Sequence, residues 1–412
     1  MTTFFDEPMG NPPGDNERFN RVETINGYTS NNKPVAEYNS GQASIKNKHH
    51  HLEDDDLDLY NYTSKIKIIG TGGAGNNTIY RTYVKGNLNR NALNTGSLEL
   101  WSVNSDAADL KKKTVHNNCR ISDIKRVLIG KNRQRGSGCG GHIELGALCA
   151  EDDKDRLTAL VSGTDLIILS YGLGGGTGTG SGPVIARTAK GVQSNFGGRP
   201  PIVISVCTFP FIVEGVHREK NAVEGLKKIR QYSDTVIMID NEKIKEHFGD
   251  YPVNDAFSSA DELVISKFIK GLTDTLSNAG VINIDFADIS RIMTKGGMSV
   301  VGVGSGKGHN KVVEAIDNSF KQVLFDVNYK TAKGMLINVI GGNDMTLEEA
   351  VSACQLANKE VGDDVDVMWG VTIDPGYVDR VDVITIFTGV YSPTLSWIDE
   401  IGKPISDTMR EV

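Results

Sequence analysis

The chain has 412 residues, enough for two domains of ordinary size, and 39% of them are hydrophobic and 23% charged, as in globular proteins. The net charge of −8 argues against non-specific nucleic-acid binding as the main activity. No apolar run reaches the roughly 20 residues that a membrane-spanning helix needs, and the N-terminus lacks the apolar core of a signal peptide. The five scattered cysteines contain no Cys-x-x-Cys pair, which favours reduced thiols over disulfides or a zinc site. We therefore expect a cytoplasmic protein with no direct membrane span, no nucleic-acid partner and no metal held by its own side chains.

Residues 1–63 differ in composition from the rest of the chain. They are rich in Asn, Gly, Pro and Ser, and their eleven acidic and five basic residues account for −6 of the net charge of −8. Such a segment cannot bury enough apolar surface to fold alone, so we predict a disordered acidic N-terminal arm over 1–63. The run His49–His51 within it could hold a metal, but solvated tail is the simpler interpretation.

The first ordered elements follow the order strand, glycine loop, helix. Residues 65–69 alternate with period two and predict a strand, 70–77 are glycine-rich, and 78–83 suit a helix. Taken alone, this pattern also fits a dinucleotide fingerprint. The next predicted strand, 98–103, runs into Asn104-Ser-Asp-Ala.

The same order recurs further along the chain. The apolar run 165–169 predicts a buried strand, and six glycines follow within 170–181. A helix is expected from Pro183, with Ser181 as its cap. Backbone N–H groups of such a loop can converge on a phosphate at the helix N-terminus. A flexible linker is the alternative, although a linker would not be flanked so tightly by a strand and a helix. Two glycine loops suit a polyphosphate held from two sides, whereas a simple dinucleotide fold needs only one.

The remaining elements predict further layers and a second domain. Strands are expected at 201–206 and 235–239, and a third glycine-rich stretch, 136–146, leads into a helix at 143–150. An amphipathic run over 255–280 predicts a central helix that joins two domains. Beyond it, strands and helices alternate as a four-stranded α+β domain, with strands at 298–303, 333–340, 365–371 and 380–387 and helices at 310–327 and 347–361.

The octapeptide Gly-Gly-Gly-Thr-Gly-Thr-Gly-Ser at 174–181 resembles the signature of the tubulin/FtsZ superfamily of GTPases. Its Thr-Gly-Ser ending is closer to the prokaryotic FtsZ branch, and Ser181 together with the tails is similar to archaeal members. The resemblance covers roughly 65–391. It implies an α/β fold, with a Rossmann-like GTPase domain built on a parallel sheet, a central helix and a smaller α+β C-terminal domain. The expected boundaries are 64–254 for the GTP-binding domain, 255–281 for the central helix, 282–391 for the C-terminal GTPase-activating and polymerisation domain, and 392–412 for a short tail.

The resemblance also implies which residues bind GTP or GDP, with Mg²⁺ as a further cofactor. In Pro-Phe-x-x-Glu-Gly, Glu214 would contact the ribose and Arg218 the nucleotide, while Asn241 would read guanine. Phe257 would stack on the base, and Asp261 would accept hydrogen bonds from guanine N1–H and its amino group, as guanine selectivity requires on physical grounds. The loop positions implied to hold the nucleotide are Gly72, Gly73, Ala74, Gly75, Asn76, Asn77, Asn104, Gly138, Gly140, Gly141, Gly174, Gly175, Gly176, Thr177, Gly178, Thr179 and Gly180.

The segment Asn-x-Asp-Phe-x-Asp, through Asn283, Asp285 and Asp288, resembles the family's catalytic loop. Carboxylates there can orient and polarise the attacking water, and an amide can fix its geometry. The family places this loop against the phosphates of the next subunit, which implies a head-to-tail homopolymer. A mid-cell division ring tethered by a membrane adaptor is then expected. The alternatives are a plasmid or phage DNA-segregation tubulin, a low-turnover regulatory paralogue, and, least well supported, a dinucleotide oxidoreductase.

Overall fold

The computed structural model describes residues 64–85, 88, 90–112, 115–116, 119–195, 198–262, 267, 286–294 and 296–393. The predicted arm over 1–63, most of the predicted central helix and the end of the chain from 394 lie outside the described residues. None of the described helices is both long enough and apolar enough to cross a bilayer.

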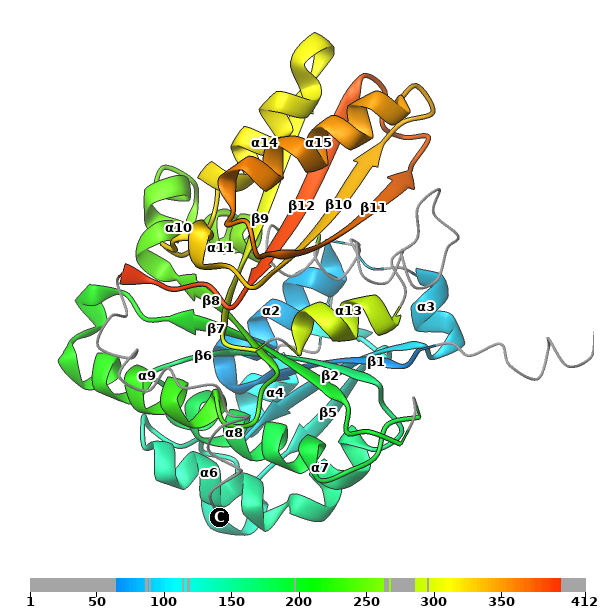
Figure 1. Cartoon of the computed structure of the whole chain (residues 1–412). Coiled ribbons are helices and arrows are strands. Elements are labelled where there is room, and N and C mark those ends of the chain that lie inside the picture. The colour runs from blue at the N-terminus through cyan, green and yellow to red at the C-terminus, as the bar shows by residue number, and fades with distance from the viewer. Residues whose placement is uncertain are drawn as a thin grey trace, which may run out of the picture. The chain divides into compact units, whose positions relative to one another are not determined.

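A ten-stranded sheet runs through the described chain in the order β11-β10-β12-β9-β8-β7-β6-β1-β2-β5 (Figure 1). The last seven strands in this order, from β9 to β5, run parallel to one another. Strand β12 is antiparallel to both of its neighbours, β10 and β9. The strands are β1 (Ile66–Thr71), β2 (Leu98–Asn104), β5 (Ile124–Leu128), β6 (Leu166–Gly172), β7 (Ile202–Phe209), β8 (Thr235–Asp240), β9 (Met298–Lys307), β10 (Gly334–Gly341), β11 (Asp366–Ile373) and β12 (Arg380–Thr388), with β3 (Val115–His116) and β4 (Cys119–Arg120) forming a separate hairpin.

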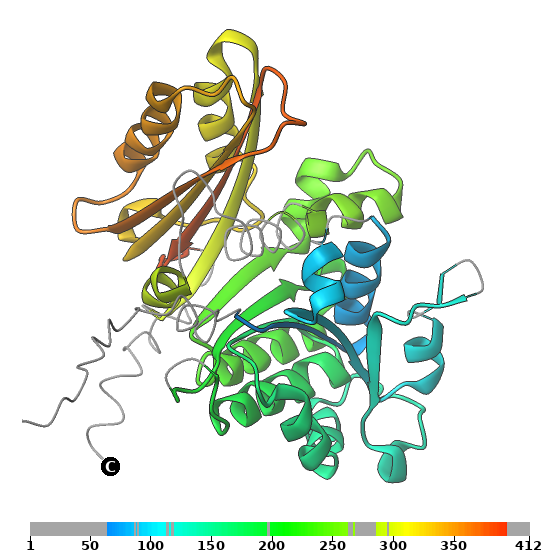
Figure 2. The same ribbon diagram turned by 90° about the vertical axis from the view of Figure 1, so that its right-hand side faces the viewer.

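Two layers of helices enclose this sheet, as Figures 1 and 2 show. One face is covered by α6 (Ile143–Asp152), α7 (Lys154–Val161), α8 (Gly176–Lys190), α9 (Val216–Ile229), α14 (Lys311–Lys321) and α15 (Leu347–Glu360). The other face is covered by α2 (Gly72–Val84), α3 (Arg90–Thr95), α10 (Asn241–Phe248), α11 (Val253–Asp261) and α13 (Phe286–Met293), while α4 (Ala107–Lys112) and α5 (Lys131–Gln134) are short connections. Each face of the sheet forms a separate hydrophobic core with its helices. Successive strand residues such as Ile68 and Ile69 belong to different cores, because side chains alternate between the faces of a strand.

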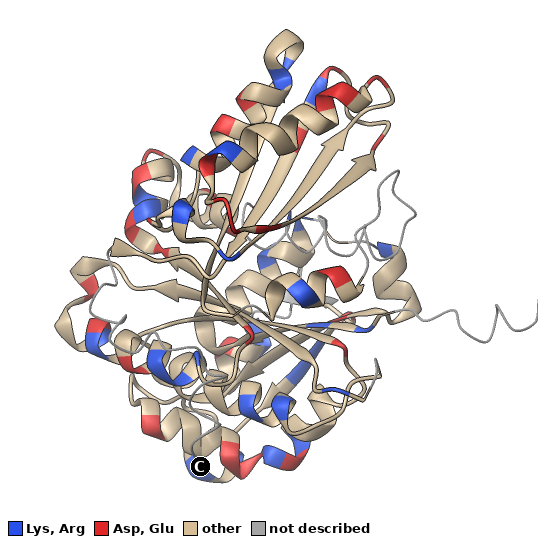
Figure 3. Ribbon diagram, viewed as in Figure 1, with Lys and Arg blue, Asp and Glu red and all other residues tan. Residues whose placement is uncertain are grey.

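The two predicted domains share this one sheet. Strand β8 pairs with β9 in parallel at Val236–Met298 and Ile237–Ser299, which continues the sheet of the first domain into that of the second. In Figure 3, acidic and basic residues are interspersed along the described helices.

The glycine segments are more helical than predicted. Helix α8 begins at Gly176 with Gly175 as its N-cap, so the expected cap Ser181 and first-turn Pro183 lie inside the helix. A Cβ on Gly180 would lie 2.2 Å from the Ile143 carbonyl oxygen of α6, so the glycines let two helix backbones approach closely. Helix α2 likewise begins at Gly72 rather than near residue 78.

Helix α14 is shorter than the predicted 310–327 and ends at Lys321. Val323, Leu324 and Phe325 are buried in succession, with Leu324 in one core and its two neighbours in the other. Alternation between two cores requires an extended chain, since a helix cannot bury three consecutive side chains on one face.

Candidate functional site

A pocket of about 450 Å³ opens where several parallel strands reach their carboxyl ends. Thr71 ends β1, Gly172 ends β6, and Thr208 and Ile239 lie near the ends of β7 and β8, and all four line it. Open α/β sheets bind ligands at this edge, because loops and helix N-termini converge there.

The pocket brings together residues from most of the stretches on which the sequence-based site depends, but the stretch that begins at Asn104 does not line it, and neither does Asp288. The predicted nucleotide-binding residues that line it are Gly72, Gly73, Ala74, Asn77, Gly141, Gly175, Gly176, Thr177, Gly178, Glu214, Arg218, Asn241, Phe257 and Asp261. The predicted residues that do not line it are Gly75, Asn76, Asn104, Gly138, Gly140, Gly174, Thr179 and Gly180.

Several residues outside the pocket wall support it from behind. A Cβ on Gly75 would lie 2.1 Å from the Ser170 carbonyl oxygen, so this glycine lets α2 pack directly on β6. Asn104 donates from Nδ2 to Asp109 Oδ2 at 2.9 Å and accepts from the Asp106 N–H at 3.2 Å, which fixes the turn after β2. These residues shape the pocket without lining it.

The glycine-lined end of the pocket is suited to an anion. Helices α2 and α8 begin there, at Gly72 and Gly176, and both first residues line the pocket. A Cβ on Gly72 would lie 2.8 Å from the Gly178 nitrogen, so the two glycine segments touch without side chains between them. Unpaired N–H groups at two helix N-termini, with the positive ends of both helix dipoles, favour phosphate.

The opposite end combines aromatic and charged side chains. Asp261 is buried, accepts a hydrogen bond from Thr78 Oγ1 at 3.0 Å, and forms an ion pair with Arg81. The Arg81 guanidinium lies 5.8 Å from the centre of the Phe257 ring, which meets Phe211 edge-on at 6.2 Å. Burial raises the pKa of the Asp261 carboxyl above its ordinary value, while the Arg81 charge and the hydrogen bonds oppose that rise.

Asn241, the first residue of α10 after β8, lines this end of the pocket. Its buried Oδ1 has no hydrogen-bond partner among the described residues. Unsatisfied buried acceptors are rare in folded proteins and are costly unless a ligand or water completes them. A ligand that donates an N–H group would satisfy this oxygen.

The rim of the pocket carries an unusual group of exposed apolar side chains. The Phe211 N–H donates to Glu214 Oε1 at 2.9 Å, and Glu214 pairs with Arg218 one helical turn later. Around these two charges the side chains of Ile212, Val213 and Val216 are 82%, 89% and 63% exposed. Contiguous exposed apolar residues on a rim are typical of an interaction surface.

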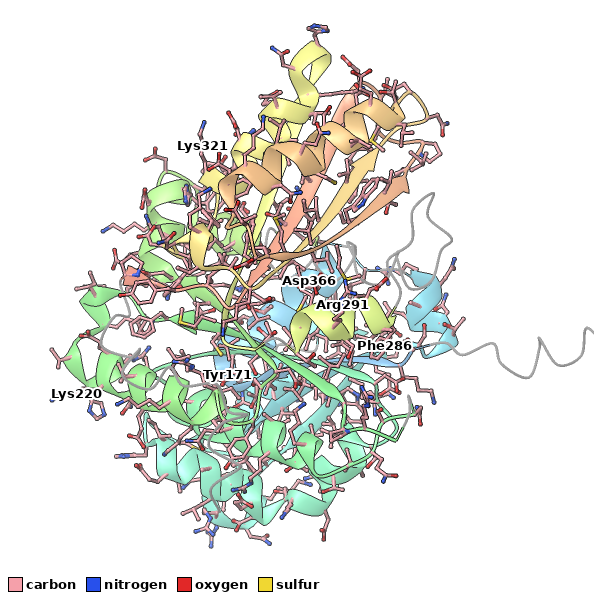
Figure 4. All side chains as sticks on the ribbon, in the orientation of Figure 1. Tyr171, Lys220, Phe286, Arg291, Lys321 and Asp366 are labelled. Atoms are coloured by element: carbon pink, nitrogen blue, oxygen red, sulfur yellow. The ribbon has the colours of Figure 1, made fainter. Side chains whose placement is uncertain are left out.

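Of the three predicted catalytic residues the structure describes Asp288, and Asp288 does not line this pocket. Asn283 and Asp285 lie outside the described residues, and half-buried Asp288 lies in the first turn of α13. Helix α13 is held at the amino-terminal edge of the sheet, where Thr235, the first residue of β8, donates to the Met293 carbonyl at 2.6 Å. Arg291 Nη2 donates to Asp366 Oδ1 at 3.1 Å, which joins α13 to β11. Figure 4 shows the two side chains side by side.

Arg81 was missed by the sequence-based reasoning. It is the single charged residue of α2, which is a detectable signal, but its partner Asp261 lies 180 residues away. Asn221 on α9 was also missed, because its contacts are to two backbone carbonyls that carry no sequence signal.

Comparison with known proteins agrees with this arrangement. The tubulin/FtsZ family GTPase domain matches residues 65–249, and the FtsZ family C-terminal domain matches 297–391. Cell division protein FtsZ 1 of Archaeoglobus fulgidus is 37% identical over 356 residues, which cover 86% of this chain and 90% of that protein.

Solved structures give the same result. The empty FtsZ dimer of M. jannaschii superimposes with a TM-score of 0.69 at 35% identity, over 82% of this chain and 92% of that one. CetZ2 of Haloferax volcanii, in a protofilament with GTPγS, has a TM-score of 0.65 at 21% identity over 84% and 99% of the two chains, a likeness of fold alone. The chain therefore belongs to the FtsZ family of cell-division GTPases, within the tubulin/FtsZ superfamily.

Proposed function

We propose that this GTPase assembles head-to-tail into filaments, hydrolyses GTP at the contact between subunits, and forms the division ring at mid-cell. The observation that carries the proposal is the separation of the pocket from Asp288. The pocket lies at the carboxyl end of β8 and α13 at its amino end. The six residues of β8 separate these ends by roughly 17 Å, at about 3.3 Å per residue. An acid on α13 can reach a bound nucleotide only in another copy of the chain.

The apolar rim supports the same assembly. Ile212, Val213 and Val216 lie next to the pocket-lining residues Phe211 and Glu214 in the chain and would be buried by a subunit placed over the nucleotide. Because the two faces of such a contact differ, the contact is heterologous and does not close, so it generates open filaments. The FtsZ dimer and the CetZ2 protofilament among the similar structures show that related proteins self-associate.

In this proposal each end of the pocket has a separate task. The N-termini of α2 and α8 hold the phosphates, Glu214 contacts the ribose and Arg218 the nucleotide, and Asn241, Phe257 and Asp261 recognise guanine. Arg81 joins this set because it pairs with Asp261 and lies over Phe257.

Mg²⁺ fits the phosphate end as a partner of the nucleotide. Within the part of the chain that the structure describes, no group of three or more His, Cys, Asp or Glu side chains is arranged to hold a metal ion. Phosphate oxygens and water would therefore supply most of its ligands, as is usual for Mg²⁺, and a bound ion would neutralise phosphate charge. The Asp109 carboxylate, whose Oδ2 lies 3.6 Å from where a Cβ on the pocket-lining Gly73 would stand, would help to hold a hydrated ion at this end.

The subunit placed above the pocket would contribute Asn283, Asp285 and Asp288. Their carboxylates orient the attacking water and accept its proton, while the amide fixes the geometry. Hydrolysis then removes the terminal phosphate from the contact, and the contact weakens. A membrane adaptor would tether the resulting filaments at the division site.

The test measures phosphate release from GTP at rising protein concentration, with light scattering recorded in parallel. We expect the rate per subunit to climb above a threshold concentration at which scattering also appears. Val213→Asp should raise that threshold while GTP affinity stays unchanged, and Leu148→Asp, an exposed apolar position on α6 outside the rim, should leave it unchanged. A rate per subunit that is independent of concentration would contradict the shared site.

A further inference from the structure

We call residues 136–142, the loop part of the third glycine-rich stretch, the third loop. The third loop contacts the phosphate segment, residues 172–178, on two sides. On one side Ser105 Oγ contacts Cys139 Sγ at 3.2 Å and Thr177 Oγ1 at 2.7 Å. A Cβ on Gly176 would lie 2.9 Å from the His142 nitrogen, so the two backbones touch there as well. This side is a packed contact, with Cys139 buried.

On the other side one side chain makes the connection. Asn221, on the second turn of α9, donates from Nδ2 to the Gly141 carbonyl at 3.0 Å and to the Gly174 carbonyl at 3.3 Å. Gly141 belongs to the third loop and lines the pocket, and Gly174 belongs to the phosphate segment. Both hydrogens of one amide are thus used to join two loops that lie 33 residues apart in the sequence.

The third loop is rich in glycine and needs side-chain contacts to hold it in one conformation. Gly136, Gly138, Gly140 and Gly141 all have positive φ, between 53° and 85°, and a Cβ on Gly140 or Gly141 would meet nothing within 4 Å. Glycines without neighbours lose much conformational entropy when ordered, so side-chain contacts must hold the loop against the pocket.

We propose that Asn221 is a positioning residue that locks the third loop against the phosphate segment and thereby sets the affinity for the terminal phosphate of GTP. The proposal rests on the proposed function in that the ligand is taken to be a guanine nucleotide with its phosphates at the glycine end. Gly141 borders the pocket beside that end, whereas Phe257 and Asp261 of the base end come from α11. A loosened third loop would therefore weaken contacts to the end of the polyphosphate and spare those to the base.

The experiment compares equilibrium binding of GTPγS and GDP to the full chain, below the assembly threshold, for the parent protein and Asn221→Ala. We expect affinity for GTPγS to fall about tenfold, the size of two lost hydrogen bonds, and affinity for GDP to change by less than about twofold. Asn221→Leu keeps the side-chain bulk without the donors and should behave in the same way. Asn195→Ala, which removes an Nδ2 bond of 3.1 Å to the Gly163 carbonyl away from the pocket, is the matched control and should change neither affinity.

The outcomes distinguish a failure of the role proposed for Asn221 from a failure of the proposed function. Equal losses for both nucleotides, or no loss for either, would overturn the role of Asn221 in reading the terminal phosphate. A drop in the unfolding temperature of both nucleotide-free variants, accompanied by loss of GDP binding, would also overturn it, because Asn221 would then be structural. If the parent protein binds neither nucleotide, the proposed function itself fails.

Discussion

The Asp261 carboxylate is buried, yet its proposed task of accepting from guanine requires it to be charged. Burial alone favours the neutral acid, because a charge loses hydration inside the protein. The Arg81 ion pair opposes this, and it leaves Asp261 in place for a base that stacks near Phe257. Arg81 thus has an electrostatic role that is separate from any contact of its own with the nucleotide.

This balance predicts a pH dependence of GTP binding. The binding-competent form of Asp261 is ionised and its pKa is raised, so affinity should be full above that pKa and fall as the pH drops through it. Arg81→Ala removes the stabilising charge, which raises the pKa of Asp261 further and moves the midpoint of the loss to higher pH. The measurement is GTP affinity across a pH titration that extends upward from the ordinary range of an Asp carboxyl. Arg187→Ala, which breaks a pair with Glu151 away from the pocket, is the control. Equal midpoints for Arg81→Ala and the parent protein would contradict this account.

At the scale of elements, local patterns were predictable and non-local contacts were not. The four C-terminal strands appear as β9 to β12, beginning within one residue of the predicted positions, because a short apolar run is visible along a single segment. The predicted start of α8 at Pro183 was wrong, because a run of glycines indicates a loop unless a second helix is known to pack on it. The pairs of Arg81 with Asp261 and of Asn221 with Gly141 join residues far apart in the sequence, and no local pattern could predict them.

The close approach of α6 and α8 can be tested at one glycine. Gly180→Ala would place a methyl group 2.2 Å from the Ile143 carbonyl oxygen and 2.6 Å from the Ala147 nitrogen. Both neighbours are backbone atoms, so the helices must separate, and we expect a loss of about 3 kcal/mol in the free energy of unfolding. Gly175→Ala, in the same segment, meets nothing within 4 Å and should change it by less than about 1 kcal/mol. Denaturant unfolding of the nucleotide-free proteins measures both, and equal stabilities would show that the crossing is not constrained by Gly180.

At the scale of the whole molecule, the parallel sheet separates the proposed binding and catalytic groups. The proposed nucleotide-binding residues are gathered at the carboxyl edge, and α13 is anchored at the amino edge by Thr235 and by the Arg291–Asp366 pair. Under the proposed function, a chain with this layout would bind GTP alone but would need a second copy to bring Asp288 to it. Binding and turnover should therefore respond independently to mutation.

Asp288→Ala tests that independence. Because Asp288 lies on the helix held at the opposite edge of the sheet from the pocket, GTP affinity measured below the assembly threshold should stay within about twofold of the parent value. Turnover should fall at least about 100-fold, the usual contribution of a positioned base, and filaments followed by light scattering should persist longer, because GTP at the contacts is consumed slowly. Asp317→Ala, which removes an exposed acid of α14 paired with Lys321, controls for the loss of charge and should retain turnover. Loss of GTP binding in Asp288→Ala would place this residue in its own subunit's pocket, and the hydrolysis step would then need no neighbour.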